Sequence, residues 1–436
     1  MGSKHCGYII EVKELRPHSN ADRLKILGVF GTETCVPLDV KVGDIGVYFP
    51  TDLQLSEEFC AANDLVERKD ENGEKAGGYL HPSKRNVKCI KLRGEKSDGM
   101  YLPISCFDYL NLAEPLKPGD VIDVLDGHEI CRKYIPAVPA KSGRSGGVKT
   151  VKKENIFPYF KEHIDTPQLR FNLDHYKKGD IICLTEKIHG TSSRNGYCLY
   201  EKEEKNIFQR IFNLKGKIKT GYKDVVGTRR TVIDTNISGA GYYGTHDFRL
   251  KWAKHFENKL HPGEEVFGEI AGFYEVNAPI MAQCNNKKTN DKNFIKKYGD
   301  ITTFSYGCDP SGIEKPLNRF FIYRMTYTSP EGYIIEYPWE LVKLRAEQMG
   351  VEVVPELETF IYTTEEDFLS RINKYMDISS TIDPTHIIEG VVIRKINSNI
   401  FDVSKEKSFN FKVIEGIIKE NAEVPDMEEA QEVGEN

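Results

Sequence analysis

Residues 184–194 read Leu-Thr-Glu-Lys-Ile-His-Gly-Thr-Ser-Ser-Arg, which places one lysine between an apolar segment and a glycine turn. Residues 181–184 are apolar and predict a buried strand. Residues 190–192 predict the turn that ends this strand. Lys187 is therefore expected to project from the end of a strand into a cleft.

A lysine in this position is a candidate nucleophile. The ordinary lysine pKa of about 10.4 leaves only about one amine in a thousand neutral near pH 7.4. Burial and a nearby cation could lower that pKa by roughly three units, at a cost of about 4 kcal/mol in solvation. The neutral amine could then attack a phosphorus or carbonyl centre. Because Lys-x-x-Gly is also frequent at ordinary strand ends, further motifs must decide between the two interpretations.

Four further segments follow Lys187 in order. Residues 266–270 predict an apolar strand with one carboxylate, residues 320–324 an aromatic strand, and residues 388–394 another strand with one carboxylate. Residues 409–414 alternate between apolar and polar side chains, predict a strand, and offer a second lysine. A single glutamate in a strand is more often solvent-facing or ion-paired than a ligand, so the argument depends on the ordered set.

This ordered set resembles the collinear motifs of the covalent nucleotidyltransferases, the superfamily of RNA ligases, DNA ligases and mRNA capping enzymes. Residues 186–191, Glu-Lys-Ile-His-Gly-Thr, resemble the RNA ligase version, in which histidine stands where the other two classes usually have aspartate. The resemblance extends from about residue 155 to residue 415. It implies that Lys187 takes AMP from ATP as a lysyl phosphoramidate.

The resemblance also assigns roles to residues of the later motifs. Glu269 matches a carboxylate near the ribose or the metal-bound waters, and Glu389 matches one that helps to hold the divalent metal. Mg²⁺ or Mn²⁺ is expected, because these ions favour oxygen ligands and bridge phosphates. Tyr323 matches the aromatic residue that stacks on adenine, with Phe321 as the alternative.

Lys412 matches a lysine that contacts the α-phosphate and stabilises charge as pyrophosphate leaves. Related ligases commonly carry two lysines here in a Lys-x-Lys pattern, whereas this chain has Asn410 in the first position. Lys407 is a candidate to supply the missing charge. The identity of the second lysine of this motif therefore stays open.

Arginines complete the predicted cofactor site. Residues 225–230 resemble a motif in which an arginine binds the ribose or the nicked strand. Adjacent arginines on a strand point to opposite faces, so only one can line the cleft, and Arg229 is the choice. The complete set of predicted cofactor-binding residues is Glu186, Ile188, His189, Arg194, Arg229, Glu269, Tyr323, Phe321 and Lys412.

The first part of the chain has a different pattern, with short alternating segments separated by Gly, Pro and Asp turns. These segments predict a small all-β barrel; they are residues 8–12, 41–49, 87–94, 97–103 and 117–122. Residues 16–24 resemble the opening of OB-type RNA-binding domains. The predicted barrel resembles the amino-terminal OB domain of the RNA ligase branch that includes the Deinococcus and Naegleria enzymes.

The predicted fold is α+β, with an all-β OB-like RNA-binding domain over residues 1–138 and a nucleotidyltransferase domain of antiparallel sheets and helices over residues 155–416. A basic Gly/Ser linker, residues 139–154, joins them, and residues 417–436 predict a disordered acidic tail. Residues 202–205 predict a polar surface loop that tunes substrate choice.

Composition agrees with a two-domain protein. The 436 residues are 39% hydrophobic, which is enough to bury a core in each domain. The net charge of -6 is mild, because an acidic tail offsets a lysine-rich body, and it does not argue against RNA as a partner. The ten cysteines form no Cys-x-x-Cys pair, and no signal peptide or membrane-length apolar run is evident. A soluble cytoplasmic or nuclear protein is expected, without a membrane or an obligate protein partner.

The sequence thus predicts an ATP-dependent RNA ligase that seals 3′-hydroxyl/5′-phosphate breaks through lysyl-AMP and RNA-adenylate intermediates. The expected substrate is a nicked duplex with RNA on the 3′-hydroxyl strand. One alternative is a GTP-dependent mRNA capping guanylyltransferase, which His189 and the missing carboxy-terminal OB domain disfavour. The other is a non-catalytic RNA-binding protein on an inactive nucleotidyltransferase fold, which only Asn410 suggests.

Overall fold

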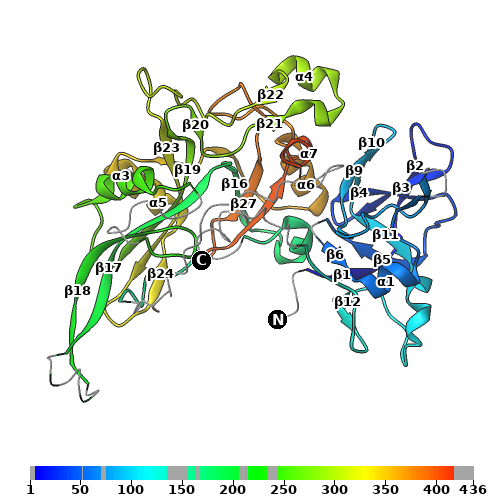
Figure 1. Ribbon diagram of the computed structural model, residues 1–436, viewed down its shortest axis with the longest axis horizontal. Helices are drawn as coiled ribbons and strands as arrows, with labels where there is room; N and C mark the ends of the chain where they lie inside the picture. The colour runs from blue at the N-terminus through cyan, green and yellow to red at the C-terminus, as the bar shows by residue number, and fades with distance from the viewer. Residues whose placement is uncertain are drawn as a thin grey trace. The chain divides into compact units, whose positions relative to one another are not determined.

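The computed structural model describes residues 5–51, 53–69, 75–134, 156–163, 166–205, 208, 212, 215–233 and 243–416. The chain divides into two compact units, residues 1–138 with 412–426 and residues 139–411 with 427–436. Both units consist mainly of antiparallel sheets with few helices (Figure 1). The predicted linker and the predicted tail lie outside the described residues.

The first unit contains short strands with α1 (Glu57–Ala62) and the 3-10 helix η1 (Ile104–Leu110). The strands are β1 (Gly7–Glu11), β2 (Leu15–Pro17), β3 (Leu24–Val29), β4 (Thr32–Pro37), β5 (Ile45–Phe49), β6 (Leu53–Leu55), β7 (Arg68–Lys69), β8 (Lys75–Gly77), β9 (Cys89–Leu92), β10 (Glu95–Asp98), β11 (Met100–Pro103), β12 (Val121–Ile122), β13 (Val124–Leu125), β14 (His128–Glu129) and β15 (Cys131–Lys133).

The predicted closed barrel is not confirmed in this unit. Its described strands form separate sheets, of which the larger ones have the orders β11-β5-β1-β12 and β2-β3-β4. A core of buried side chains holds the unit together, with Phe59 of α1 packed among Val47, Phe49 and Phe107. The predicted predominance of short strands is therefore present, but the strands of the described residues do not form a closed barrel.

The second unit is built on two larger sheets. A four-stranded sheet has the order β26-β16-β27-β28, and a seven-stranded sheet has the central order β18-β17-β19-β23-β24. Its strands are β16 (Ile181–Glu186), β17 (Thr191–Glu204), β18 (Lys217–Gly227), β19 (Glu264–Glu275), β20 (Ala278–Pro279), β21 (Cys284–Asn285), β22 (Ile301–Thr302), β23 (Asn318–Thr328), β24 (Ile334–Glu336), β25 (Glu352–Val353), β26 (Glu356–Ile361), β27 (Gly390–Lys395) and β28 (Val403–Lys407).

Short helices accompany these sheets. They are η2 (Leu169–Phe171), η3 (Leu173–His175), α3 (Asp247–Phe256), η4 (Asn286–Thr289), α4 (Lys292–Tyr298), α5 (Trp339–Met349), α6 (Glu365–Lys374) and α7 (Phe409–Glu415). None of the helices in the described ranges is both long and apolar enough to cross a membrane. Four predicted strands are confirmed: residues 181–184 lie in β16, residues 266–270 in β19 and residues 320–324 in β23. Of the fourth segment, 388–394, residues 390–394 lie in β27 and the first two residues precede it.

The four-stranded sheet separates its side chains into an apolar face and a polar face. Ile182 and Leu184 of β16, with Val391 and Ile393 of β27, are buried in one cluster with Phe368 of α6. Burying one such side chain contributes about 2 kcal/mol, so this face fixes the sheet against the helix. Alternation along the strands turns the intervening residues to the opposite face, where the candidate site lies.

Helix α7 corrects one prediction, since residues 409–414 are helical and not a strand. Ser408 Oγ accepts a hydrogen bond from the Phe411 backbone N–H at 3.1 Å, as a capping residue does at the first turn of a helix. Apart from Asn410, all residues of this segment are buried. Over only six residues, the sequence pattern of such a helix cannot be distinguished from that of a strand.

Candidate active site

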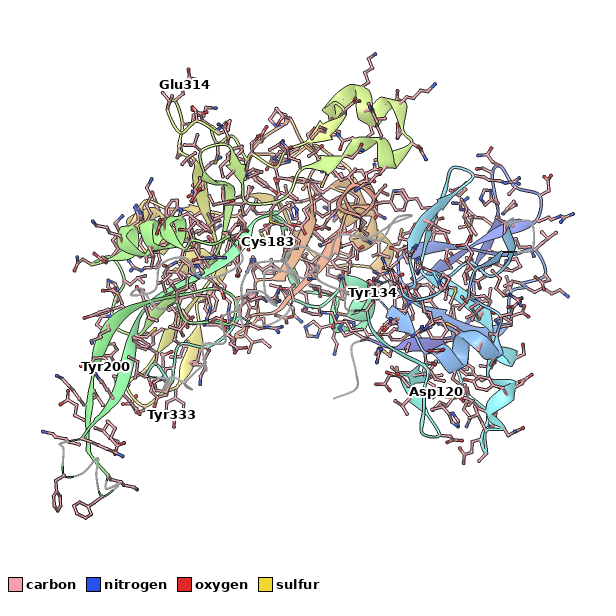
Figure 2. All side chains as sticks on the ribbon, in the orientation of Figure 1. Asp120, Tyr134, Cys183, Tyr200, Glu314 and Tyr333 are labelled. Atoms are coloured by element: carbon pink, nitrogen blue, oxygen red, sulfur yellow. The ribbon has the colours of Figure 1, made fainter. Side chains whose placement is uncertain are left out.

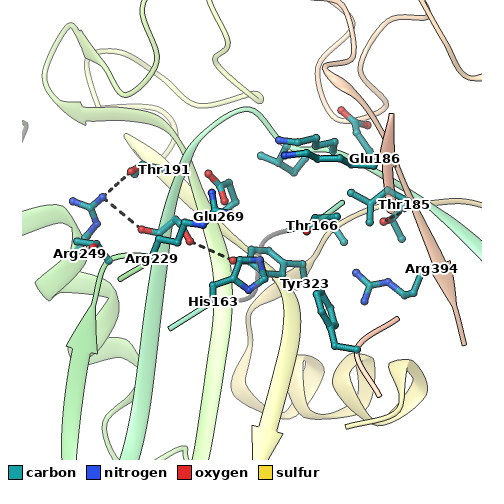
Figure 3. Close-up of a pocket in the computed structure, with 18 residues that line it drawn as sticks. His163, Thr166, Thr185, Glu186, Thr191, Arg229, Arg249, Glu269, Tyr323 and Arg394 are labelled. Carbon is teal, nitrogen blue, oxygen red and sulfur yellow. Dashed lines mark hydrogen bonds between the residues drawn. The ribbon is translucent and has the colours of Figure 1, made fainter. Parts of the chain in front are cut away.

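A cavity of about 110 Å³ lies in the second unit (Figure 3). Both large sheets and the loops between their strands contribute to its wall. The lining residues are His163, Thr166, Thr185, Glu186, Lys187, Ile188, Thr191, Ser192, Thr228, Arg229, Arg249, Glu269, Tyr323, Val354, Val392, Arg394, Phe401 and Lys405.

The polar face of the four-stranded sheet aligns basic side chains toward this cavity. Thr185 of β16 pairs with Val392 of β27, which pairs in turn with Lys405 of β28, and all three line the cavity. One step along the sheet, the Lys187 backbone N–H donates to the Gly390 carbonyl at 3.0 Å. Gly390 pairs with Lys407 in the next strand. The two-residue spacing of Lys405 and Lys407 therefore places both lysines on the cavity face.

Lys187 and Lys407 share one buried carboxylate. Lys187 Nζ lies 2.7 Å from Glu389 Oε1, and Lys407 Nζ lies 3.3 Å from the same oxygen. Glu389 and Lys407 are buried, whereas the Lys187 side chain is 12% exposed and reaches the cavity. This arrangement fixes the Lys187 amine at the cavity wall with a second cation next to it.

The loop from β16 to β17 depends on Gly190. A Cβ atom at this position would collide with the Ile270 carbonyl oxygen and would come within 3.0 Å of the Glu269 side chain. Only glycine allows the loop to pass this close to β19. The glycine of the Lys-x-x-Gly pattern thus brings Lys187 and Glu269 to the same cavity.

Tyr323 reaches the cavity because of a bulge in β23. Phe267 of β19 pairs with Arg324, but the next residue, Gly268, pairs with Ile322. Tyr323 is therefore the extra residue on its strand, and a bulge of this kind can re-aim a side chain. This local irregularity puts the tyrosine ring into the cavity wall.

The bulge also decides between the two predicted aromatic residues. Phe321 is 1% exposed and packs in the core, whereas Tyr323 lines the cavity. Tyr323 Oη lies 3.3 Å from Ser192 Oγ. Burial raises the pKa of Tyr323 to about 12, so its hydroxyl stays protonated at neutral pH.

His163 lines the cavity beside Tyr323 and was not predicted. The two rings meet edge to face with centroids 5.0 Å apart, and the Phe401 ring lies 5.8 Å from His163 on another side. Burial, together with the charges of Arg229 and Arg324, holds the pKa of His163 well below its usual range. The imidazole is therefore neutral at pH 7. No sequence motif marks this residue, which precedes the first recognised strand of the unit.

Three arginines line the cavity, Arg229, Arg249 and Arg394. Arg229 lines it, while the adjacent Arg230 is exposed; both residues follow the end of β18 at Gly227, so the alternation along a strand that the sequence suggested does not apply to them. Arg249 of α3 is buried, and its Nη2 donates to Thr191 Oγ1 at 2.6 Å and to the Ser192 carbonyl at 3.5 Å (Figure 3). Arg249 was missed because nothing in its local sequence separates it from an ordinary helix arginine.

Arg194 and His189, both predicted to bind the cofactor, are buried and do not line the cavity. Arg194 Nε donates to the Thr228 carbonyl at 2.6 Å, and its Nη1 donates to the Lys161 carbonyl. Arg194 thus anchors the two loops that carry Arg229 and His163. The His189 ring packs between Phe304 and Phe411, with its Nδ1 3.8 Å from Glu389 Oε2. Both residues support the cavity wall from behind.

Glu186 and Ile188, which flank the lysine, line the cavity as predicted, but the Glu186 carboxylate has partners of its own. Its Oε1 accepts from Ser380 Oγ at 2.6 Å, and its Oε2 accepts from the Thr381 backbone N–H at 2.9 Å and from the Thr381 hydroxyl. These bonds tie β16 to residues 380 and 381.

Lys412 is not among the cavity-lining residues. It is grouped with the first unit, where its Nζ lies 3.0 Å from Asp98 Oδ2. The prediction took residues 409–414 for a strand, and the helical course of α7 gives Lys412 a different direction. The Lys-x-Lys pattern expected of this motif occurs instead on β28, as Lys405-Glu406-Lys407.

Glu269 and Glu389 are the carboxylates available for a metal ion. Within the described ranges, no group of three or more His, Cys, Asp and Glu side chains is arranged to hold one. Mg²⁺ keeps several waters and usually binds one or two carboxylates together with substrate phosphates. Glu269 lines the basic cavity and Glu389 lies 2.7 Å from Lys187 Nζ at its wall, and one or two such carboxylates fit this mode of binding.

Comparison with known proteins identifies the family. The sequence profile described as RNA ligase matches residues 180–414, which is more than half of the chain. The matched segment contains the Lys187 strand, both carboxylates and the β28 lysines. The chain therefore belongs to the RNA ligase family. No curated protein sequence matches the chain.

Solved structures with a similar fold include several of Naegleria gruberi RNA ligase. A lysine-to-alanine variant with ATP and Mn has a TM-score of 0.53 and 16% identity, over 92% of this chain and 96% of that chain. An arginine-to-alanine variant with ATP and Mn has a TM-score of 0.52 and 17% identity, over 94% and 98%. The form with PPi has a TM-score of 0.51 and 15% identity, also over 94% and 98%. This similarity establishes the mixed fold with antiparallel sheets.

Proposed function

We propose that the chain is an ATP-dependent RNA ligase that joins a 3′-hydroxyl end to a 5′-phosphate end. The observation that carries this proposal is the position of Lys187 Nζ at the wall of the cavity, 2.7 Å from Glu389 and next to Lys407. A nucleophilic amine, a carboxylate and further cations are the groups that nucleotidyl transfer to lysine requires.

In the first step, the neutral amine of Lys187 attacks the α-phosphorus of ATP. A nitrogen–phosphorus bond forms, the bond to the bridging oxygen breaks, pyrophosphate leaves with the electron pair, and the proton that Nζ loses passes to solvent. Lys405 lines the cavity, and Lys407, on the same face of the sheet, is not a lining residue but lies with its Nζ 3.3 Å from Glu389 Oε1, so both lysines add positive charge near the phosphates. We assign to them the role that the sequence resemblance gave to Lys412.

The nucleoside end of ATP fits the wall formed by Tyr323 and its neighbours. An aromatic ring offers a stacking surface for adenine, and neutral His163 meets Tyr323 edge to face. Glu269 and Arg229 line the same cavity and are suited to the ribose and its phosphates. The similar N. gruberi structures contain ATP, which supports this choice of nucleotide.

Glu389 and Glu269 would hold the divalent metal, Mg²⁺ or Mn²⁺, with waters completing its shell. When bound, the ion supplies positive charge to the phosphates of the nucleotide. Glu389 also fixes the amine of Lys187, so the loss of its carboxylate would disturb both the charge and the direction of the nucleophile. Mn accompanies ATP in the N. gruberi structures, which supports metal dependence here.

In the later steps, AMP passes from Lys187 to an RNA 5′-phosphate, and a 3′-hydroxyl then attacks this adenylate and releases AMP. The substrate that we favour is a nicked duplex with RNA on the 3′-hydroxyl side. The first unit, with its short strands, is proposed to act as an OB-like RNA-binding region. Family membership supports RNA as the substrate class.

A two-part experiment tests the proposal. The purified chain is incubated with labelled ATP or GTP, and then with nicked duplexes that carry RNA or DNA on each side of the break. Labelling by ATP and sealing that requires RNA at the 3′-hydroxyl side are expected. Labelling by GTP alone would indicate a capping guanylyltransferase, and no labelling at all would indicate a protein that only binds RNA.

A further inference from the structure

Strands β17 and β18 continue beyond the sheet to which they belong. β19 pairs with β17 only along Thr191–Gly196, whereas β18 pairs with β17 as far as Glu204. Residues 197–204 and 217–224 thus form a two-stranded extension, here called the ribbon (Figure 1). The sequence predicted a polar loop at residues 202–205, but residues 202–204 are part of β17.

The ribbon begins at the candidate active site. Thr191 and Ser192, at the start of β17, line the cavity, as do Thr228 and Arg229, which directly follow β18. From the pair Arg194–Gly227 to the pair Glu204–Lys217, each strand advances ten residues. At about 3.3 Å per residue, the end of the ribbon lies about 33 Å along the strands from the cavity.

The two faces of the ribbon differ in charge. The register places Lys202 opposite Lys219, and Lys217 and Lys223 share the face of Lys219 because they are separated by even numbers of residues. Those three lysines of β18 are all exposed. Of the acidic residues, Glu204 alone shares this face, which we call the lysine face.

The register places the buried Tyr200, labelled in Figure 2, on the side of the lysine face, and Lys223 Nζ lies 4.7 Å from the centre of its ring. The opposite face carries the remaining carboxylates, Glu201, Glu203 and Asp224, together with Ile218 and the paired rings of Tyr197 and Tyr222. The segregation of charge is therefore nearly complete. A surface that balanced opposite charges for solubility would mix them on both faces.

Aromatic side chains stand at the far end of the ribbon. Phe208 and Phe212 follow β17, their ring centroids are 4.5 Å apart, and they are 62% and 59% exposed. From residue 197 to residue 224 the chain has seven basic and four acidic residues, although the whole chain has a net charge of -6. A line of lysines with exposed aromatic rings is suited to a nucleic-acid backbone and its bases.

We infer that the lysine face of the ribbon binds the phosphate backbone of the duplex that flanks the break. This inference rests on the proposed function, since it takes the RNA-containing substrate of the same active site as the ligand. At about 3.4 Å per nucleotide, the end of the ribbon lies roughly ten nucleotides outward from the site of joining. Polyanion binding explains why the exposed lysines of the ribbon occupy one face.

The test uses the full chain with Lys217→Glu and Lys219→Glu together, and as a milder pair Lys217→Gln with Lys219→Gln. The matched control reverses two exposed lysines of α4, Lys292→Glu with Lys296→Glu, on a helix that contributes nothing to the cavity. Binding and sealing are measured on three nicked duplexes. In the first, both arms are about 20 base pairs long. In each of the other two, one arm is shortened to about 6 base pairs.

We expect the ribbon variants to bind and seal the long-armed duplex about tenfold less well than the wild type and with a shallower salt dependence. When the arm that contacts the ribbon is short, wild type and ribbon variants should bind and seal equally well. The control should behave as the wild type on every duplex. AMP labelling of the protein, which needs no RNA, should be unchanged and shows that the variants are folded.

Equal binding of the long-armed duplex by wild type and both ribbon variants would overturn the inference and leave the ribbon as a surface for a protein partner. A loss that is the same for both arm lengths would also overturn it. The proposed function fails separately, if the wild type is not labelled by ATP. In that case the comparison of duplex binding still decides the role of the ribbon.

Discussion

Glu186 and Glu389 lie at the ends of neighbouring strands, on either side of the Lys187 backbone, and both side chains are fully buried. Their surroundings differ in kind. Glu186 accepts hydrogen bonds from neutral groups of Ser380 and Thr381. Glu389 Oε1 lies 2.7 Å from Lys187 Nζ and 3.3 Å from Lys407 Nζ.

The difference shows that burial and closeness in the strand do not by themselves mark a catalytic carboxylate. Hydroxyl and backbone donors satisfy a carboxylate locally and hold two chain segments together. A carboxylate with cationic partners can instead release them and bind a metal ion, while the cations pair with the phosphates of a bound nucleotide. Glu186 therefore has a structural role in this account, and Glu389 a role in the reaction.

The largest effect is expected for Glu389→Gln. A neutral amide can neither balance a divalent ion nor orient Lys187 as the carboxylate does, so the rate of AMP attachment to the protein should fall about 100-fold. The measurement is the single-turnover rate with labelled ATP, with Mn²⁺ raised to look for partial recovery. A wild-type rate at low metal concentration would reduce Glu389 to the structural role of Glu186.

A slightly smaller loss is expected when the β28 lysines are removed. Lys405→Ala and Lys407→Ala each delete a cation from the face that carries Lys187, and the rate of AMP attachment should fall about 10- to 100-fold. Lys412→Ala is the matched control, since this lysine pairs with Asp98 and does not line the cavity. If only the Lys412 variant is impaired, the reassignment to β28 is incorrect.

Glu186→Gln should act on stability more than on rate. The new amide N–H group would face the hydroxyl and backbone donors of Ser380 and Thr381, so unfolding should become easier by about 2 kcal/mol. The AMP attachment rate of the folded protein should change less than threefold. Denaturant unfolding and single-turnover labelling of the same sample measure both quantities. A rate loss as large as that of Glu389→Gln would remove the distinction between the two carboxylates.

The smallest effect is a pH dependence from His163. Because its pKa in the folded protein lies well below its usual range, His163 stays neutral, while in the unfolded chain it gains a proton below about pH 6.5. Its contribution to stability is therefore complete above that pH and falls by up to about 1.4 kcal/mol per pH unit below it. The difference between the unfolding free energies at pH 7.5 and pH 5.5 should be smaller for His163→Asn than for the wild type. Equal divergence would mean that His163 is protonated in the fold.

The sequence predicted the parts of the site that depend on strand alternation and local turns. Lys187 and Glu269 line the cavity because the apolar segments before or around them form the expected strands. It left Tyr323 and Phe321 unresolved, because the choice depends on a bulge that arises from the pairing of β19 with β23. A register shift between distant strands has no signature within either one.

Other parts of the prediction failed for reasons of tertiary structure. The sequence of α7 predicts a strand that carries Lys412, whereas the Lys-x-Lys pair lies on β28. The short strands of the first unit were expected to close into a barrel, and closure depends on pairings that the sequence does not specify. Arg249 and His163 come from segments without a motif and could only be found by their position.

The central claim is that Lys187 accepts AMP from ATP, and peptide mapping of the ATP-treated wild-type chain by mass spectrometry tests it most directly. The account predicts one added AMP on the peptide that contains Lys187, and no added AMP anywhere in Lys187→Ala prepared in the same way. AMP attached to another residue, or a Lys187→Ala protein that is labelled as the wild type is, would contradict it.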